Sequence, residues 1–138
     1  MGTSTNAILV YGVALHDFDE EQFHALPFSD GDEDDDFDSF IARRAGIPTR
    51  GEEGYDYKNI MAATEAYPLS LVSHCSLEYP CWVLGVKATE KTAHRGHPVL
   101  LGGSLPKIPN DGVRELKAVC EEFGIEFVPD WVLCSNWA

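Results

Sequence analysis

The sequence predicts an α+β fold, with a mainly antiparallel sheet of about four strands on which a C-terminal amphipathic helix and one or two shorter helices pack. Residues 67–89 contain two apolar runs around a short turn, and each run alternates with the period of two that is typical of a half-buried β-hairpin. Residues 111–123 repeat apolar side chains at spacings of three and four, which predicts an amphipathic helix ended by Gly124. Residues 126–137 alternate again and carry two tryptophans, which predicts a final strand.

The N-terminal third is predicted to contain one strand and then helical segments. Residues 7–15 are apolar on both alternate sides, which is typical of a strand covered on both faces. Acidic residues at the start of residues 19–26 favour one or two helical turns there, because they suit the positive end of the helix dipole. Residues 37–45 place large apolar side chains on one face of a short helix, which Gly46 ends.

The middle of the chain supplies a second short helix and a candidate edge strand. Residues 49–56 contain two glycines and are predicted to form a loop before a helix over residues 57–66. Within the hairpin, alternate residues of 69–75 and of 82–88 are expected to share one face. Residues 98–101 form an apolar run that begins with proline, which predicts a brief edge strand.

Charge is distributed unevenly along the chain. With 138 residues, 44% of them hydrophobic and 11% aromatic, the chain is predicted to fold as a single domain, residues 1–138. Residues 1–42 contain eleven Asp or Glu and no Lys or Arg, whereas residues 43–138 contain twelve acids and ten bases, so the first segment carries −11 of the formal net charge of −13. Such a field repels nucleic acid and anionic membranes and favours a basic surface of a host protein as the partner. The sequence therefore predicts neither direct nucleic-acid binding nor membrane binding.

The strongest concentration of charge is an acidic loop at residues 29–38, whose like charges predict a solvated segment. Counted from Asp30, a calcium-binding EF-hand would require Gly at the sixth position and Glu at the twelfth, where this chain has Asp35 and Ile41. The match fails at both positions, which favours a solvated acidic loop and leaves only loose, weak binding of divalent ions as the alternative. Its candidate partner-binding residues are Asp30, Asp32, Glu33, Asp34, Asp35, Asp36 and Asp38.

The sequence also predicts where the protein is found. Its first residues lack the positively charged region of a secretory signal, and no segment approaches the roughly 20 apolar residues of a membrane span. Four cysteines without an export signal are expected to be reduced thiols in a cytoplasm. The oligomeric state is not indicated.

Histidine and cysteine, the residues that bind zinc, gather between residues 74 and 97. The members are His74, Cys75, Cys81, His94 and His97. Their spacing argues against a metal, because Cys75 and Cys81 are six residues apart and the adjacent strand residues His74 and Cys75 are expected to point to opposite faces. A nucleophilic cysteine would need a thiolate beside an imidazole, and no nucleophile motif accompanies these residues. The sequence therefore predicts no metal, no cofactor and no catalytic residue, and it favours core positions for the thiols.

A small basic island follows the hairpin and consists of Lys91, His94, Arg95 and His97. These residues are candidates for binding a phosphate or carboxylate, since arginine can hold either group with two hydrogen bonds. The alternative is that the island balances the acidic segment within the molecule. The overall negative charge favours this structural role, because it opposes an anionic ligand.

Several short runs carry a resemblance to a known group of proteins: NAILVYGV near the start, HCSLEYPCWVLGVKAT across the hairpin, HRGHP after it, and WVLCSNW at the end. With them the chain resembles small acidic proteins of unassigned function from actinobacteria and their bacteriophages. In that family an opening strand with Tyr-Gly and a closing Trp-rich strand bracket an acidic loop. The resemblance implies a cytoplasmic context that includes phage-encoded proteins, and it implies no catalytic residues.

Two functions from different classes are consistent with these observations. The first is a non-enzymatic acidic interaction protein, such as a phage-encoded inhibitor or nucleic-acid mimic, that binds a basic surface on a host protein. The alternative is a small hydrolase or metal-dependent enzyme that uses the His/Cys cluster 74–97. The regional charge and the lack of a catalytic motif favour the first.

Overall fold

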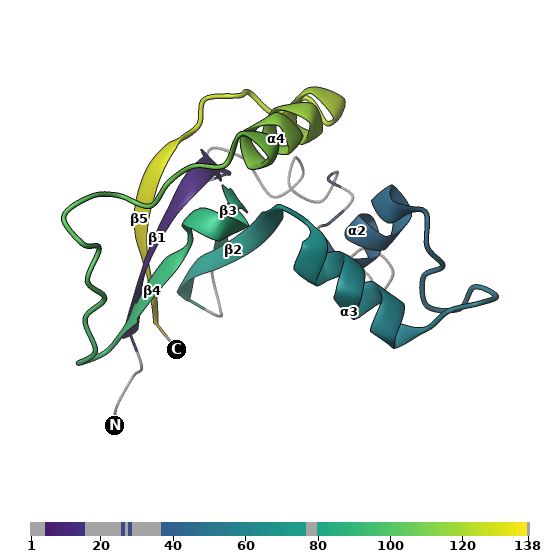
Figure 1. Ribbon diagram of the computed structural model, residues 1–138, viewed down its shortest axis with the longest axis horizontal. Coiled ribbons are helices and arrows are strands. Elements are labelled where there is room, and N and C mark those ends of the chain that lie inside the picture. Colours follow the sequence, from purple (N-terminus) through teal and green to yellow (C-terminus); the bar gives the residue numbers. More distant parts are fainter. Residues whose placement is uncertain (1–4, 16–25, 27, 29–36, 77–79, 138) are drawn as a thin grey trace. The chain divides into compact units, whose positions relative to one another are not determined.

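The computed structural model describes residues 5–15, 26, 28, 37–76 and 80–137 (Figure 1). The chain divides into two compact units, a sheet unit formed by Met1–Asp17 with Pro68–Ala138 and a helical unit formed by Phe18–Tyr67. The α+β class predicted from the sequence is confirmed, with a five-stranded sheet and three α-helices in the described ranges. Residues 19–25 of the predicted helical turns and residues 29–36 of the acidic loop lie outside these ranges.

The sheet is mixed rather than mainly antiparallel. Its strands are β1 (Thr5–Ala14), β2 (Leu69–Ser76), β3 (Pro80–Val86), β4 (Lys91–His94) and β5 (Asp130–Trp137), in the order β3-β2-β5-β1-β4. The predicted hairpin is present as β2 and β3, which pair from Leu69↔Val86 to Cys75↔Pro80. β1 and β5 pair antiparallel over eight residue pairs and lie side by side in Figure 1, whereas β2 and β5 are parallel.

The edge strand predicted over residues 98–101 is wrong. The edge strand of the sheet is β4, whose Ala93 pairs with Ala7 of β1, and Leu100 is 91% exposed. The sequence of β4, KTAH, contains no apolar run that would predict a strand. It becomes a strand because the chain, after leaving β3, continues antiparallel along the same neighbour, β1.

Four strands close into a hydrogen-bonded ring, because β1 pairs not only with β5 but also with β3, while β2 pairs with both β3 and β5. One apolar cluster takes side chains from all four strands. Its members are Ile8, Val10, Val72 and Val83, with Ala14, Val132 and Cys134 packed against them. Gly12 and Gly85 pair where β1 meets β3, and a Cβ atom on Gly12 would lie 2.3 Å from the Leu84 carbonyl oxygen. Only glycine permits this close approach of two backbones.

A buried threonine lies where the partner of β1 changes from β4 to β3. Thr89 ends the 3₁₀ turn η1 (Lys87–Thr89) and is fully buried. Its hydroxyl accepts a hydrogen bond from the Tyr11 N–H at 3.0 Å and donates one to the Val86 carbonyl at 2.6 Å. The side chain thereby satisfies a β1 backbone group that neither neighbouring strand reaches.

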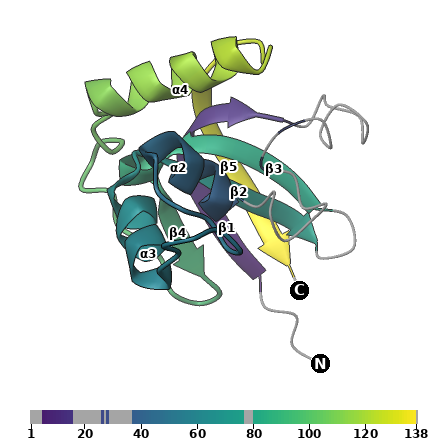
Figure 2. The ribbon, with the colours of Figure 1, turned by 90° about the vertical axis from the view of Figure 1, so that its right-hand side faces the viewer.

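Helix α4 (Asn110–Glu122) packs over β3 and lies across the strands in Figure 2. Its Leu116, Val119 and Cys120 are fully buried. Gly112 brings the helix close to Val86, since a Cβ atom there would lie 2.6 Å from the valine Cγ1. The chain continues beyond α4 into β5, so the helix is not the last element. None of the helices in the described ranges is long and apolar enough to cross a membrane.

The helical unit contains α2 (Phe37–Ala45) and α3 (Tyr57–Ala66), which have the bounds that the sequence predicts. Gly46 follows α2 with φ +74°, the left-handed conformation expected of a C-terminal glycine. Asp56 caps α3 by accepting a hydrogen bond from the Lys58 N–H at 2.9 Å. The aromatic rings of Phe28, Phe37, Phe40 and Tyr67 contact one another and form the centre of this unit.

A candidate metal centre at the end of the hairpin

One histidine and two cysteines converge where the β2–β3 hairpin approaches its turn. His74 of β2 pairs with Cys81 of β3, and Cys75 pairs with Pro80. One ligand atom from each of His74, Cys75 and Cys81 lies within 4.8 Å of the other two. Cys75 Sγ lies 3.3 Å from His74 Nδ1. Among the residues that the structure describes, these three make up the group with the spacing that a metal ion requires.

The convergence depends on the backbone of Cys75. The expectation that His74 and Cys75 point to opposite faces is wrong, because it assumes a regular strand. Cys75 has φ +72°, the left-handed region that residues other than glycine, asparagine and aspartate rarely adopt. This conformation breaks the alternation of side chains and brings the Cys75 thiol to the imidazole of its neighbour. Holding such a residue costs about 1–3 kcal/mol, and strain of this kind gathers at functional sites.

The group borders the apolar interior of the ring. Alternation along β2 and β3 places the His74–Cys81 pair on the same side as the buried Val72–Val83 pair. All three residues of the group are half-buried. Small ions can therefore reach them, while the apolar neighbours lower the local dielectric constant and strengthen any charge interaction.

The pKa values of the nearby thiols are raised. A hydrogen bond with Cys75 is the main cause of the raised pKa of Cys81, and burial adds to it. Burial also raises the pKa of Cys134, and electrostatic interactions with Cys75 and Glu90 add smaller contributions. Cys81 is consequently a protonated thiol at neutral pH, whereas a nucleophilic cysteine needs to be a thiolate. A divalent cation could take the place of the proton, because its charge stabilises thiolates.

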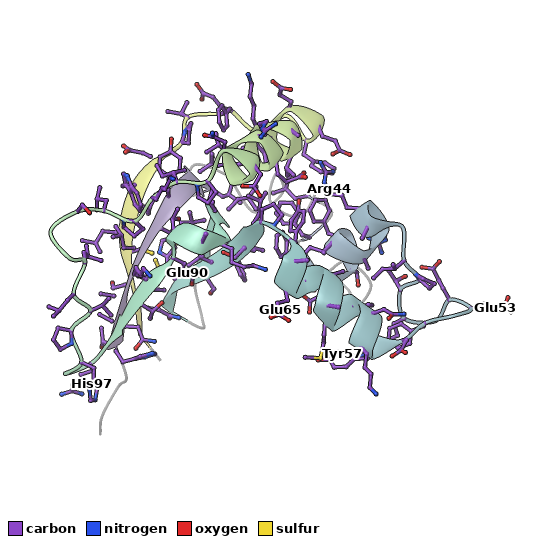
Figure 3. The ribbon with its side chains drawn as sticks, in the orientation of Figure 1. Arg44, Glu53, Tyr57, Glu65, Glu90 and His97 are labelled. Atoms are coloured by element: carbon purple, nitrogen blue, oxygen red, sulfur yellow. The ribbon has the colours of Figure 1, made fainter. Side chains whose placement is uncertain are left out.

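The other two histidines of the sequence cluster do not join this group. His94 lies on β4 and forms a row across the sheet with Asn6, Asn136 and Cys75, so three strand spacings, or about 14 Å along the sheet, separate it from Cys75. His94 Nδ1 is instead 3.1 Å from the Asn6 side-chain oxygen. His97 lies at the tip of the connection that follows β4 (Figure 3).

The basic island lies on the surface, with Lys91 and His94 on β4 and Arg95 and His97 in the turn that follows it. Lys91, His94, Arg95 and His97 are all exposed, and the His97 N–H donates to the His94 carbonyl at 2.8 Å across Gly96, which has φ +78°. Its side chains therefore form no enclosed anion site. The acidic residues that the island was expected to balance belong to the helical unit, and Asp30, Asp32, Glu33, Asp34, Asp35 and Asp36 lie outside the described residues. Asp38 is exposed in the first turn of α2 and accepts a long hydrogen bond, 3.5 Å, from Thr64.

The sequence contained a signal for the His74–Cys81 contact. A hairpin that runs from Leu69↔Val86 toward its turn necessarily sets residue 74 opposite residue 81. The positive φ of Cys75 had no such signal, because neither glycine nor asparagine marks the position. No known protein family, curated protein or solved structure matches this chain.

Proposed function

We propose that this protein is a non-enzymatic interaction protein whose acidic segment, the loop at residues 29–38, binds a basic surface on another protein. The observation that carries the proposal is the regional charge: −11 of the net −13 belongs to residues 1–42, which contain no Lys or Arg. A field of one sign attracts a partner of the opposite sign and accelerates its association. The four free thiols fit a reducing cytoplasm as the compartment where this partner is met.

The partner that fits best is a protein whose basic surface normally binds nucleic acid. Residues 30–38 contain seven carboxylates in nine residues. In an extended chain this corresponds to one charge every 4 Å or so, close to the roughly 3.4 Å per phosphate along one nucleic acid strand. The segment can therefore act as a nucleic-acid mimic, and the resemblance to actinobacterial and phage proteins favours a phage-encoded inhibitor of a host protein.

A small hydrolase is the second candidate, and the 3.3 Å approach of Cys75 Sγ to His74 Nδ1 is the observation that favours it. Hydrolysis by cysteine needs an imidazole at hydrogen-bond distance from the thiol. An activated Cys75 would react with iodoacetamide much faster than Cys81 at neutral pH, and His74→Ala would remove this difference. Equal rates in the wild type would dismiss this candidate.

The interaction proposal is tested by neutralising the segment. A five-acid variant changes Asp32, Asp34, Asp35 and Asp36 to Asn and Glu33 to Gln. The wild type should displace labelled duplex DNA from basic DNA-binding proteins of the same cell, with an apparent affinity that falls steeply with salt. The variant should lose most of this displacement and most of the salt dependence, while its melting temperature stays close to that of the wild type because solvated charges contribute little stability.

A matched control separates local charge from net charge. It neutralises five exposed acids outside the segment, namely Glu53, Glu65, Glu121, Glu122 and Glu126. Both variants have the same net charge, so only the location of the lost charges differs. The control should displace DNA almost as well as the wild type. Equal displacement by the five-acid variant and the wild type at low salt would contradict the proposal.

A further inference from the structure

The separations within the group of His74, Cys75 and Cys81 are close to those between the ligands of a single zinc ion. With Zn–S bonds of about 2.3 Å and Zn–N bonds of about 2.05 Å, tetrahedral geometry places ligand atoms about 3.6–3.8 Å apart. The measured Nδ1–Sγ distance is 3.3 Å, and the three ligand atoms lie within 4.8 Å of one another. Side-chain rotations that move the ligand atoms by about 1 Å or less would bring separations of up to 4.8 Å to the tetrahedral values.

The donor set also selects the class of metal. Two thiolates and one neutral imidazole are ligands that zinc prefers to calcium or magnesium, which take oxygen. Two thiolates balance the charge of a divalent cation, so the bound group would be neutral beside the apolar interior of the ring. The three residues are half-buried, which leaves an entry path, and all four cysteines of the chain are free thiols.

We propose that His74, Cys75 and Cys81 bind one zinc ion, with the fourth coordination position open. The positive φ of Cys75 has a role in this site, since a regular strand would direct its thiol to the opposite face. All three residues of the site belong to the sheet unit. An open fourth position is the arrangement in which zinc holds a water molecule or an incoming ligand.

Zinc binding is tested on reduced, metal-free protein with zinc chloride as the probe. Competition with a chromophoric chelator should show one equivalent bound to the wild type. Cobalt substituted for zinc should give the thiolate charge-transfer band and the strong visible bands of a tetrahedral ion. Cys75→Ser and Cys81→Ser should each lower the affinity by more than the roughly 10–100-fold that loss of an outer partner of a metal ligand costs. His74→Ala should do the same.

Two controls isolate the site. Cys134→Ser removes another half-buried thiol of the sheet unit and should leave the affinity unchanged. The five-acid variant should also bind zinc as the wild type does, because it keeps all three ligands. A metal ion held by carboxylates of the acidic segment would give no thiolate band. Zinc should raise the melting temperature of the wild type but not that of Cys81→Ser. The melting transition of Cys81→Ser itself shows whether that variant is folded.

Several results would overturn the proposal. One is the absence of zinc uptake by the reduced protein, including the case in which Cys75 and Cys81 are isolated as a disulfide. A second is uptake without the thiolate band and lost in the five-acid variant, which would assign the ion to the acidic segment. A third is a loss of affinity in Cys134→Ser as large as that in Cys81→Ser, which would exclude the three-ligand site.

Discussion

Replacing Gly85 with alanine tests the close approach of β1 and β3 that closes the ring. A Cβ atom at Gly85 would lie 2.5 Å from Val10 Cγ2, while the next atoms are 3.6 Å away or more. Overpacking of this kind costs about 1–3 kcal/mol. At an unhindered position the same change would stabilise the protein by about 0.4–1 kcal/mol, through the entropy of the unfolded chain. The sign of the effect therefore distinguishes a crowded site from an open one.

The clash involves one methyl group, so a second substitution can relieve it. Val10 is fully buried, and Val10→Ala should cost about 2 kcal/mol, from two lost methyl-sized groups at about 0.8 kcal/mol each and a small cavity. In the double variant, the new Cβ at position 85 occupies space that Val10 Cγ2 has left. We expect the double variant to be about 1–3 kcal/mol more stable than the sum of the single effects predicts.

Urea unfolding followed by tryptophan fluorescence measures all three variants. Trp82, Trp131 and Trp137 all belong to the sheet unit, so the signal reports the unit that contains the ring. An additive double variant, within about 0.5 kcal/mol, would refute the close approach of β1 and β3. A stabilised Gly85→Ala would refute it as well.

Three further predictions concern single side chains. Thr89→Val should destabilise the protein by about 1–3 kcal/mol in urea unfolding, because it leaves the Tyr11 N–H without its acceptor, and Thr89→Ser should recover most of the loss. Hydrogen bonds from the Thr49 hydroxyl and N–H lower the pKa of Glu52. This contact is therefore complete above the ordinary pKa of Glu and is lost as the pH falls through the lowered value. Carboxyl NMR titration should show a midpoint below the ordinary range, and Thr49→Val should move that midpoint upward. Burial raises the pKa of Cys120 to about 11, so mass spectrometry of iodoacetamide-treated protein at pH near 8 should find it the last cysteine to be alkylated, and equal rates in the folded protein would contradict its burial.

Local patterns in the sequence predicted the local elements well. The bounds of α2 follow from apolar spacing and from the stop signal at Gly46, α3 follows the glycine-containing loop 49–56, and the hairpin follows from its alternation. Each of these signals acts between residues that are close in the chain. Such local signals do not depend on how the remainder of the chain folds.

Features that depend on distant segments were missed. β4 owes its strand conformation to β1, and the parallel contact of Cys75 with Asn136 joins two strands that are far apart in sequence. The sequence argues against a metal site because alternation in a regular strand separates His74 from Cys75, whereas Cys75 has φ +72°. A local backbone distortion of one residue reverses the direction of a side chain, and apolar periodicity carries no information about it.

The pairing of β1 with β5 joins the first described strand to the last, with Thr5 opposite Trp137. During synthesis on the ribosome, β1 therefore emerges long before its principal neighbour exists. The β2–β3 hairpin can form early because its strands adjoin, but the ring must wait until residues 130–137 have left the exit tunnel. In the interval the apolar side chains of β1 have no native partner on that edge, so this strand is exposed to aggregation in the nascent chain.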